Sequence, residues 1–316
     1  MTSDIQDIRA RASRSGEAGT RARHVVILLL VGGLWGIQPA LIKAATGGRL
    51  EEIEALAVTL SSVAAMVGLY LAATKRLFWP SAALCGFLAV CGTAEYAAPL
   101  VATFLVAPHI DSALIVLILS TTPVFTVALA ALTGSEALTG QSLAACLLGL
   151  AGLMLLVVPE GALPSPEMLS WCIGAFVIPM CYALGSVYVS HRWPQELDAV
   201  QVSFGGTLFA GLILSPFWLP ALVSGRVAEA LASDHWVFLA LSFALVAEMI
   251  MYFYLLQNAG AVFTSFSSFV MIVSGFIAGF LLFGEWPTPW VLASLTLLVA
   301  SLALVLSRPR APEIPS

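Results

Sequence analysis

Two stretches of sequence that repeat each other decide the fold. Residues 123–156 read PVFTVALAALTGSEALTGQSLAACLLGLAGLMLL, and residues 272–305 read IVSGFIAGFLLFGEWPTPWVLASLTLLVASLALV. They align without a gap, and each contains an apolar run, a short turn with one glutamate, and a second apolar run. Glu136 in the first turn aligns with Glu285 in the second. This pattern indicates a chain built from two related halves, as many membrane transporters are.

Apolar runs of similar length recur along the whole chain. Hydrophobic side chains make up 60% of the 316 residues and charged side chains only 10%, against about 25% charged in soluble proteins. A helix needs about 20 mainly apolar residues to cross a bilayer, and over runs of this length only helices satisfy the backbone within lipid. We therefore predict an all-α integral membrane protein with ten spans. They lie near 25–45, 53–73, 80–104, 110–132, 140–158, 169–190, 199–219, 235–257, 261–283 and 289–306.

The basic residues favour an even number of crossings. With the amino terminus inside, ten of the thirteen Lys and Arg residues fall on the cytoplasmic side, and only Arg49 and Arg226 fall outside. Cytoplasmic loops carry such an excess of positive charge. We therefore expect a multi-pass protein of the inner, cytoplasmic membrane of the cell with both termini cytoplasmic. The ten residues are Arg9, Arg11, Arg14, Arg21, Arg23, Lys75, Arg76, Arg192, Arg308 and Arg310.

Ten spans divide into two halves of five. Because five is odd, the second half enters the membrane in the opposite direction, and such inverted repeats give alternating access. We expect the first repeat over 24–158 and the second over 169–306, with a solvated basic tail at 1–23 and a short cytoplasmic tail at 307–316. A weaker match lays LWGIQPALIK at 34–43 against CYALGSVYVS at 181–190.

Three stretches resemble the EamA-type transporters of the drug/metabolite transporter superfamily. They are LWGIQPALIK at 34–43, LILSTTPVFTVALAALTGSEALT at 117–139 and VMIVSGFIAGFLLFGEWPT at 270–288. Two positions depart from that family's pattern, because Ile272 stands where a second proline is usual and Ser135 stands where a glycine is usual. The resemblance covers about residues 25–306. It implies the fold of two inverted five-helix repeats and an exporter of small metabolites, amino acids, related amphipathic compounds or drugs, coupled to protons or to exchange.

Two carboxylic acids are expected near the middle of their spans. Glu95 lies in AEYAAPLVATFLVA at 94–107, and Glu248 lies in AEMIMYFYLLQNA at 247–259. A charge at a helix centre costs about 2.5–3.5 kcal/mol on insertion scales, several times what one leucine contributes. Since the two acids occupy similar places in the repeat, we expect them to approach each other at a central cavity and at least one of them to bind a proton or a cationic substrate group in turn. The alternative is that both are hydrogen-bonded packing residues.

Five further residues complete the candidate substrate and proton site. Lys43, near the outer end of the first span, either holds an anionic group or snorkels toward the interface. Gln38 and Trp35 share that span with a proline, so the helix either lines the cavity through a bend or tolerates the proline by packing. Tyr96 adjoins the first acid, and Tyr252 follows the second by four residues and shares its helix face.

Two other sets of residues are read as structural. The two turn glutamates of the repeat are expected to brace helix starts. Gly32 with Gly36, and Gly275 with Gly279, are spaced so that helices can approach closely.

Several classes of function are disfavoured. The sequence contains no serine-hydrolase, zinc-protease or phosphate-loop motif, and its four histidines are dispersed without metal-ligand spacing. We therefore expect no enzyme activity, no metal and no cofactor. The basic residues form a tail rather than a stripe with aromatics, which argues against nucleic acid as a partner. The expected partners are a small-molecule substrate and the lipid bilayer; a homodimer is left open, and a cation channel is the main alternative to a carrier.

Overall fold

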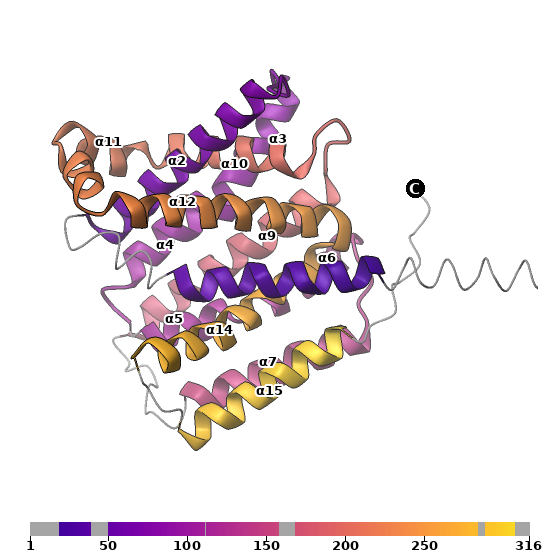
Figure 1. Ribbon diagram of the computed structural model, residues 1–316. Coiled ribbons are helices and arrows are strands. Elements are labelled where there is room, and N and C mark those ends of the chain that lie inside the picture. Colours follow the sequence, from indigo (N-terminus) through magenta and orange to yellow (C-terminus); the bar gives the residue numbers. More distant parts are fainter. Residues whose placement is uncertain (1–18, 39–49, 111, 158–167, 284–287, 307–316) are drawn as a thin grey trace, which may run out of the picture.

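The computed structural model shows apolar helices connected by short segments (Figure 1). Among the described residues, seven helices are long and apolar enough to cross a membrane, or eight if the bent pair Ala199–Ile213 and Ser215–Val223 forms one span. Gly140–Leu155 and Ala261–Ile277 are shorter apolar helices. The predicted all-α membrane class is confirmed, whereas the arrangement of ten helices as two inverted repeats stays a prediction. The structure describes residues 19–38, 50–110, 112–157, 168–283 and 288–306.

The helices follow the predicted spans in order. The first half contains a helix over Gly19–Gln38, then α2 (Glu52–Ala73), α3 (Ala82–Gly92), the π-helical turn η1 (Thr93–Ala97), α4 (Ala98–Val106), α5 (Ser112–Leu119), α6 (Thr122–Thr133) and α7 (Gly140–Val157). The second half contains α8 (Leu169–Ala175), α9 (Val177–His191), α10 (Ala199–Ile213), α11 (Ser215–Val223), α12 (Arg226–Ala259), α13 (Ala261–Ser265), α14 (Ser267–Phe283) and α15 (Pro289–Leu306).

Prolines explain several of the helix breaks. Pro123, Pro179 and Pro216 each stand in the first turn of a new helix, where the missing N–H has no helical partner to lose. The span predicted over 199–219 is bent, because α10 ends at Ile213 and α11 leaves it at an angle of 70°.

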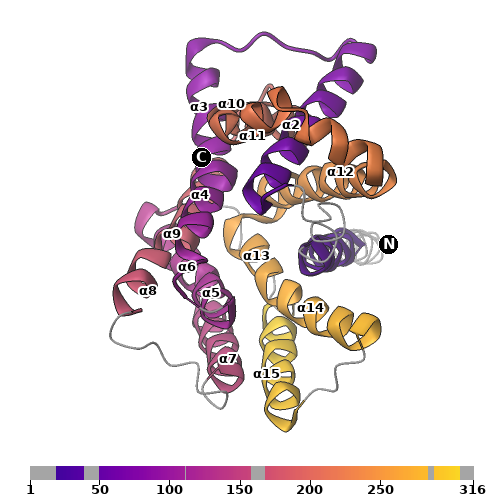
Figure 2. The ribbon, with the colours of Figure 1, turned by 90° about the vertical axis from the view of Figure 1, so that its left-hand side faces the viewer.

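Pairs of helices from the two halves pack along each other. α7 lies along α15, and α2 packs on α10; Figures 1 and 2 both place α7 beside α15. The amino-terminal helix approaches α14 closely at Gly36. Any side chain there would collide with α14, since a Cβ atom would lie 2.8 Å from the Gly275 nitrogen. The Ser274 hydroxyl donates a 3.1 Å hydrogen bond to the Gly32 carbonyl at the same contact. The close approach predicted for these glycines is confirmed at Gly32 and Gly36.

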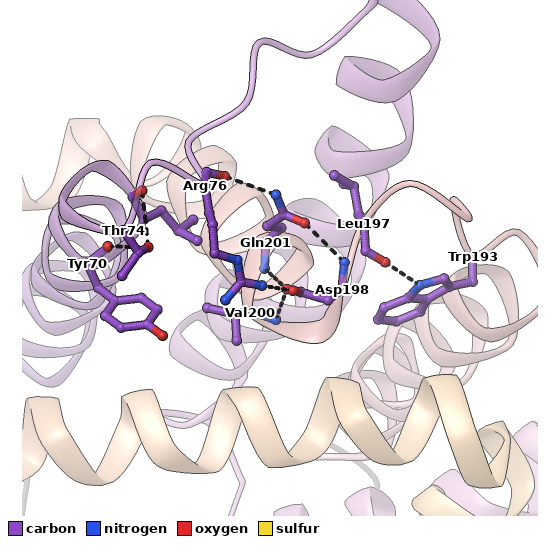
Figure 3. Close-up of polar contacts among 9 residues, drawn as sticks. Tyr70, Thr74, Arg76, Trp193, Leu197, Asp198, Val200 and Gln201 are labelled. Atoms are coloured by element: carbon purple, nitrogen blue, oxygen red, sulfur yellow. Dashed lines mark hydrogen bonds and ion pairs between the residues drawn. The ribbon is translucent and has the colours of Figure 1, made fainter.

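An ion pair connects each end of α2 to a neighbouring helix. Just beyond its carboxyl end, Arg76 pairs with Asp198, the N-cap of α10, and Gln201 donates a 3.0 Å hydrogen bond to the Arg76 carbonyl (Figure 3). At its amino end, Arg226 of α12 donates two hydrogen bonds, of 2.6 and 2.8 Å, to the Glu54 carboxylate. The two ion pairs therefore join α2 to α10 at one end and to α12 at the other.

Glu136 braces a helix that belongs to the other half of the chain. Its Oε1 atom accepts a 3.0 Å hydrogen bond from the Val262 N–H, in the first turn of α13. A Cβ atom at Gly260 would lie 2.7 Å from the same oxygen and would displace the carboxylate, and the positive φ of 88° at this position also favours glycine. The bracing role predicted for Glu136 is confirmed, and its repeat counterpart Glu285 lies outside the described residues.

Candidate functional site

Glu95 lies in the π-helical turn between α3 and α4. The Ala98 N–H bonds to the Thr93 carbonyl, five residues earlier instead of four. The cause is Pro99, which has no N–H for the Glu95 carbonyl and whose ring would clash with it in an α-helix. The helix accommodates the proline with one extra residue in the turn, a feature often found at functional sites.

The Glu95 carboxyl is enclosed by α9 and α12. Its side chain is only 3% exposed, and the Tyr252 hydroxyl donates a 2.8 Å hydrogen bond to its Oε2 atom. On the α9 side, the backbone at Gly185 packs directly against the carboxyl. A Cβ atom at this position would lie 2.9 Å from the Glu95 carboxyl carbon, which is too close. The other oxygen, Oε1, is buried and has no hydrogen-bond partner within the described parts of the chain. Such an atom is costly in a low-dielectric interior unless a proton or a cation is bound.

Glu248 is also buried, in the middle of α12, but it borders a cavity. It is 5% exposed, and the side chain of Trp35 is its hydrogen-bond partner. The cavity has a volume of about 10 Å³, and a site of about that size holds one water molecule. It is lined by Leu34, Trp35, Gln38, Leu241, Ala244, Leu245 and Glu248.

Two aromatic side chains connect the acids. The rings of Trp35 and Tyr252 lie 5.5 Å apart, so Glu95 contacts Tyr252, Tyr252 contacts Trp35, and Trp35 contacts Glu248. Within the described residues no direct hydrogen bond joins the two carboxyl groups. The expected approach of the two acids is therefore bridged by aromatic rings from the first helix and α12.

Two further tyrosines surround the acids. The Tyr96 hydroxyl is buried without a hydrogen-bond partner in the described parts, and its ring meets Phe253 edge-on at 6.4 Å. Tyr96 and Tyr182 of α9 both interact electrostatically with the two acids. Among the tyrosines of the apolar spans, the sequence favoured Tyr96 and Tyr252 for the site over Tyr182. The signal was present in the alignment of 34–43 on 181–190, which places Trp35 opposite Tyr182.

The structure thus brings together six of the seven residues predicted for this site. Glu95, Tyr96 and Tyr252 lie around the first carboxyl, and Trp35 and Gln38 lie beside the second. Lys43 is outside the described residues. The described parts also contain no group of three or more His, Cys, Asp or Glu residues that would hold a metal ion.

The second half of the chain has a recognisable family. Residues 169–307 match the model of the family described as the EamA-like transporter family. The matched segment is less than half of the chain, so the match is a similarity of this segment to the family. The EamA-like part carries Tyr182, Gly185, Glu248 and Tyr252, and the match indicates a membrane transporter of the drug/metabolite transporter type.

Comparison with solved structures gives the fold of nearly the whole chain. No curated protein matches the sequence. A solved structure described only as "Crystal structure of protein" is similar with a TM-score of 0.68, over 90% of this chain and 98% of that chain, at 17% sequence identity. At this identity the likeness concerns the fold alone, and it extends well beyond the EamA-like part.

Proposed function

We propose that the protein is a secondary active transporter that exports small metabolites by alternating access, coupled to protons or to exchange. Amino acids, related amphipathic compounds and drugs are the substrates that this proposal includes. The observation that carries it is the pair of buried acids, Glu95 and Glu248, connected through Tyr252 and Trp35. Ionisable residues at such depth in membrane proteins mark proton relays and substrate pathways.

The proposal includes ten spans arranged as two inverted repeats. Within the described residues, eight spans, with the bent pair counted as one, and two shorter apolar helices would make ten crossings. The packing supports the symmetry, because α3 packs on α10 just as its counterpart α12 packs on α2. Likewise α6 packs on α9, and the amino-terminal helix packs on α14. Each contact recurs with the halves exchanged, as a pseudo-twofold axis requires.

The proposed repeats occupy 24–158 and 169–306, and the family match begins at the first residue of the second repeat. We place both termini in the cytoplasm and the protein in the inner membrane, since ten of the thirteen basic residues would then lie inside. Members of this family act as carriers, which agrees with the absence of enzyme motifs in the sequence.

The chemistry of the site suits a carrier that exchanges cations for protons. A buried carboxyl must be either protonated or paired with a cation. A proton and a positively charged substrate group therefore compete for the same acids. With five helices in each half, the centre can be opened to each side of the membrane in turn.

The test begins with a screen of metabolites exported by overexpressing cells. The substrate found is then offered to proteoliposomes at two pH values, with the wild type, Glu95→Gln, Glu248→Gln and Glu229→Gln. Glu229 lies exposed on the same helix as Glu248 and serves as the matched control. We expect saturable transport whose pH dependence is lost in the first two variants only. Unchanged pH dependence in both would remove proton coupling, and single-channel currents would favour the cation channel.

A further inference from the structure

The two acids differ in their surroundings, and we infer that they have different tasks. Glu248 is the carboxyl that meets the cationic group of an amphipathic amine, and Glu95 is a sealed proton site that is linked to it through Tyr252 and Trp35. This inference deepens the proposed transport function and rests on it.

Access distinguishes the two carboxyls. Glu248 borders the cavity, together with the Gln38 amide and three leucine side chains. Glu95 instead has Tyr252 on one oxygen and the backbone of Gly185 against its carboxyl carbon. A ligand that enters beside Trp35 therefore reaches Glu248 first.

The difference can be traced to one pair of positions in the repeat. The alignment of 34–43 on 181–190 places Gln38 opposite Gly185. Gln38 contributes a side chain to the space beside Glu248, whereas Gly185 has none, so α9 closes on Glu95. The space beside Glu248 is therefore a cavity, whereas the equivalent space beside Glu95 is filled by the backbone of α9.

The cavity lining indicates the chemical class of the ligand. Among the described residues that line the cavity, Glu248 is the only charged one, and it attracts a cation. The indole ring of Trp35 adds a cation–π surface, and Leu34, Leu241 and Leu245 accept an apolar group. A compact amine with an apolar substituent fits this combination. In the present conformation the cavity has a volume of only about 10 Å³. The surrounding helices must therefore separate to admit such an amine.

The two acids are also coupled mechanically. An ammonium group at Glu248 competes with the Trp35 indole N–H for the carboxylate. Movement of Trp35 changes its contact with Tyr252, the hydrogen-bond donor to Glu95. A buried carboxyl that loses its donor is left with an uncompensated desolvation cost. Ligand occupancy at Glu248 therefore alters the proton occupancy of Glu95.

Within the described parts of the chain, the groups that face each acid do not supply a competing positive charge. Glu95 faces Cys91 and Tyr96 of its own span, Cys181 and Tyr182 of α9, and Tyr252 of α12. α10 also packs on this turn and contains no titratable residue. Glu248 faces Trp35, Tyr96 and Tyr182.

Labelling with dicyclohexylcarbodiimide tests the difference in access. This lipid-soluble reagent modifies protonated carboxyls in membranes, and peptide mass mapping locates the product. Wild-type protein in proteoliposomes at mildly acidic pH is expected to be labelled at Glu248 at least about tenfold faster than at Glu95, because a sealed site reacts only during local opening. Equal labelling, faster labelling of Glu95, or no labelling of Glu248 would each overturn the inference. Glu248→Gln removes the expected product, and Glu229→Gln keeps it.

Protection by a probe amine tests the ligand class in the same assay. Phenethylammonium is expected to slow the labelling of Glu248, whereas phenethyl alcohol, its uncharged analogue, is not. Equal protection by both, or by neither, overturns the cationic ligand. Transport measured on the same proteoliposomes separates the two proposals. A reversed labelling pattern with intact pH-dependent transport overturns only the division of tasks, while absence of transport in the wild type overturns the proposed function.

Discussion

The Tyr252 hydroxyl donates a 2.8 Å hydrogen bond to Glu95, a residue 157 positions earlier in the chain and in the opposite half. The bond ties α12 to the π-helical turn at the centre of the molecule. Since Tyr252 also packs against Trp35, this one side chain contacts both sides of the candidate site.

Tyr252→Phe removes the donor to Glu95 while keeping the ring. We expect the transport rate to fall about fivefold, because a lost hydrogen bond is worth about 1 kcal/mol. Initial rates in proteoliposomes measure this, with Tyr70→Phe as the control because Tyr70 is 51% exposed. Equal rates for the two variants would contradict a positioning role for the hydroxyl.

Glu95→Gln is expected to abolish the proton flux that accompanies substrate movement, because an amide cannot take up or release the proton. A pH-sensitive dye inside the proteoliposomes measures that flux beside the substrate signal. Glu196→Gln, at an exposed position of the α9–α10 connection, should leave it unchanged. Persistent proton flux in Glu95→Gln would show that the proton travels elsewhere.

Pro99→Ala restores an N–H group for the Glu95 carbonyl, which allows the π-helical turn to become α-helical. An α-helical turn contains fewer residues than a π-helical one, so the change alters the direction of the Glu95 side chain relative to the helix that follows it. We expect transport to be lost while the melting temperature in detergent stays the same or rises, since a helix-interior proline has been removed. Pro220→Ala, inside α11, is the control and should retain transport. Full activity in Pro99→Ala would mean that the turn has no role in placing the acid.

Gly36→Ala is expected to destabilise the protein by about 1–3 kcal/mol, the usual cost of overpacking. A Cβ atom there would lie 2.5 Å from the Met271 carbonyl and 2.8 Å from the Gly275 nitrogen. Gly33→Ala is a matched control, because a Cβ at Gly33 meets nothing within 4 Å. Thermal unfolding in detergent compares the two. A Gly33 variant as unstable as the Gly36 variant would contradict the packing explanation.

Glu54→Gln leaves the Arg226 guanidinium without its carboxylate. Because the Arg226 side chain is 42% exposed, we expect a loss of only about 1 kcal/mol. Thermal unfolding measures it, and the exchanged pair Glu54→Arg with Arg226→Glu should recover part of the loss. If the exchanged pair is less stable than either single variant, the contact depends on more than charge.

The residues that the sequence revealed are those whose chemistry is unusual for their surroundings. Glu95 and Glu248 stand out because a carboxyl within an apolar run is rare and costly, and the repeat placed them in similar positions. Trp35, Gln38 and Tyr252 followed from their distance to these acids or to the first-span motif. The residue types at the centre of the candidate site were therefore predictable from the sequence.

Other features depend on contacts that one sequence does not contain. Gly185 acts through the side chain it lacks, so no residue type signalled its contact with Glu95. The 70° bend after Ile213 was missed because the hydropathy stays high through the whole segment. The contact between Glu136 and Val262 joins residues 126 positions apart, and only the packed fold brings them together.

The ion pairs at the two ends of α2 are reached by water, whereas the bond to Glu95 is not. The side chains of Arg76 and Asp198 are 41% and 42% exposed, so dissolved salt screens their attraction, over about 10 Å at 0.1 M. Buried contacts are screened much less. A change in ionic strength therefore alters the ion pairs at the ends of α2, and a change in pH alters the buried acids in the middle of the helix bundle. In a single sample, the salt dependence of transport reports on how α2 is held, separately from the state of the two acids.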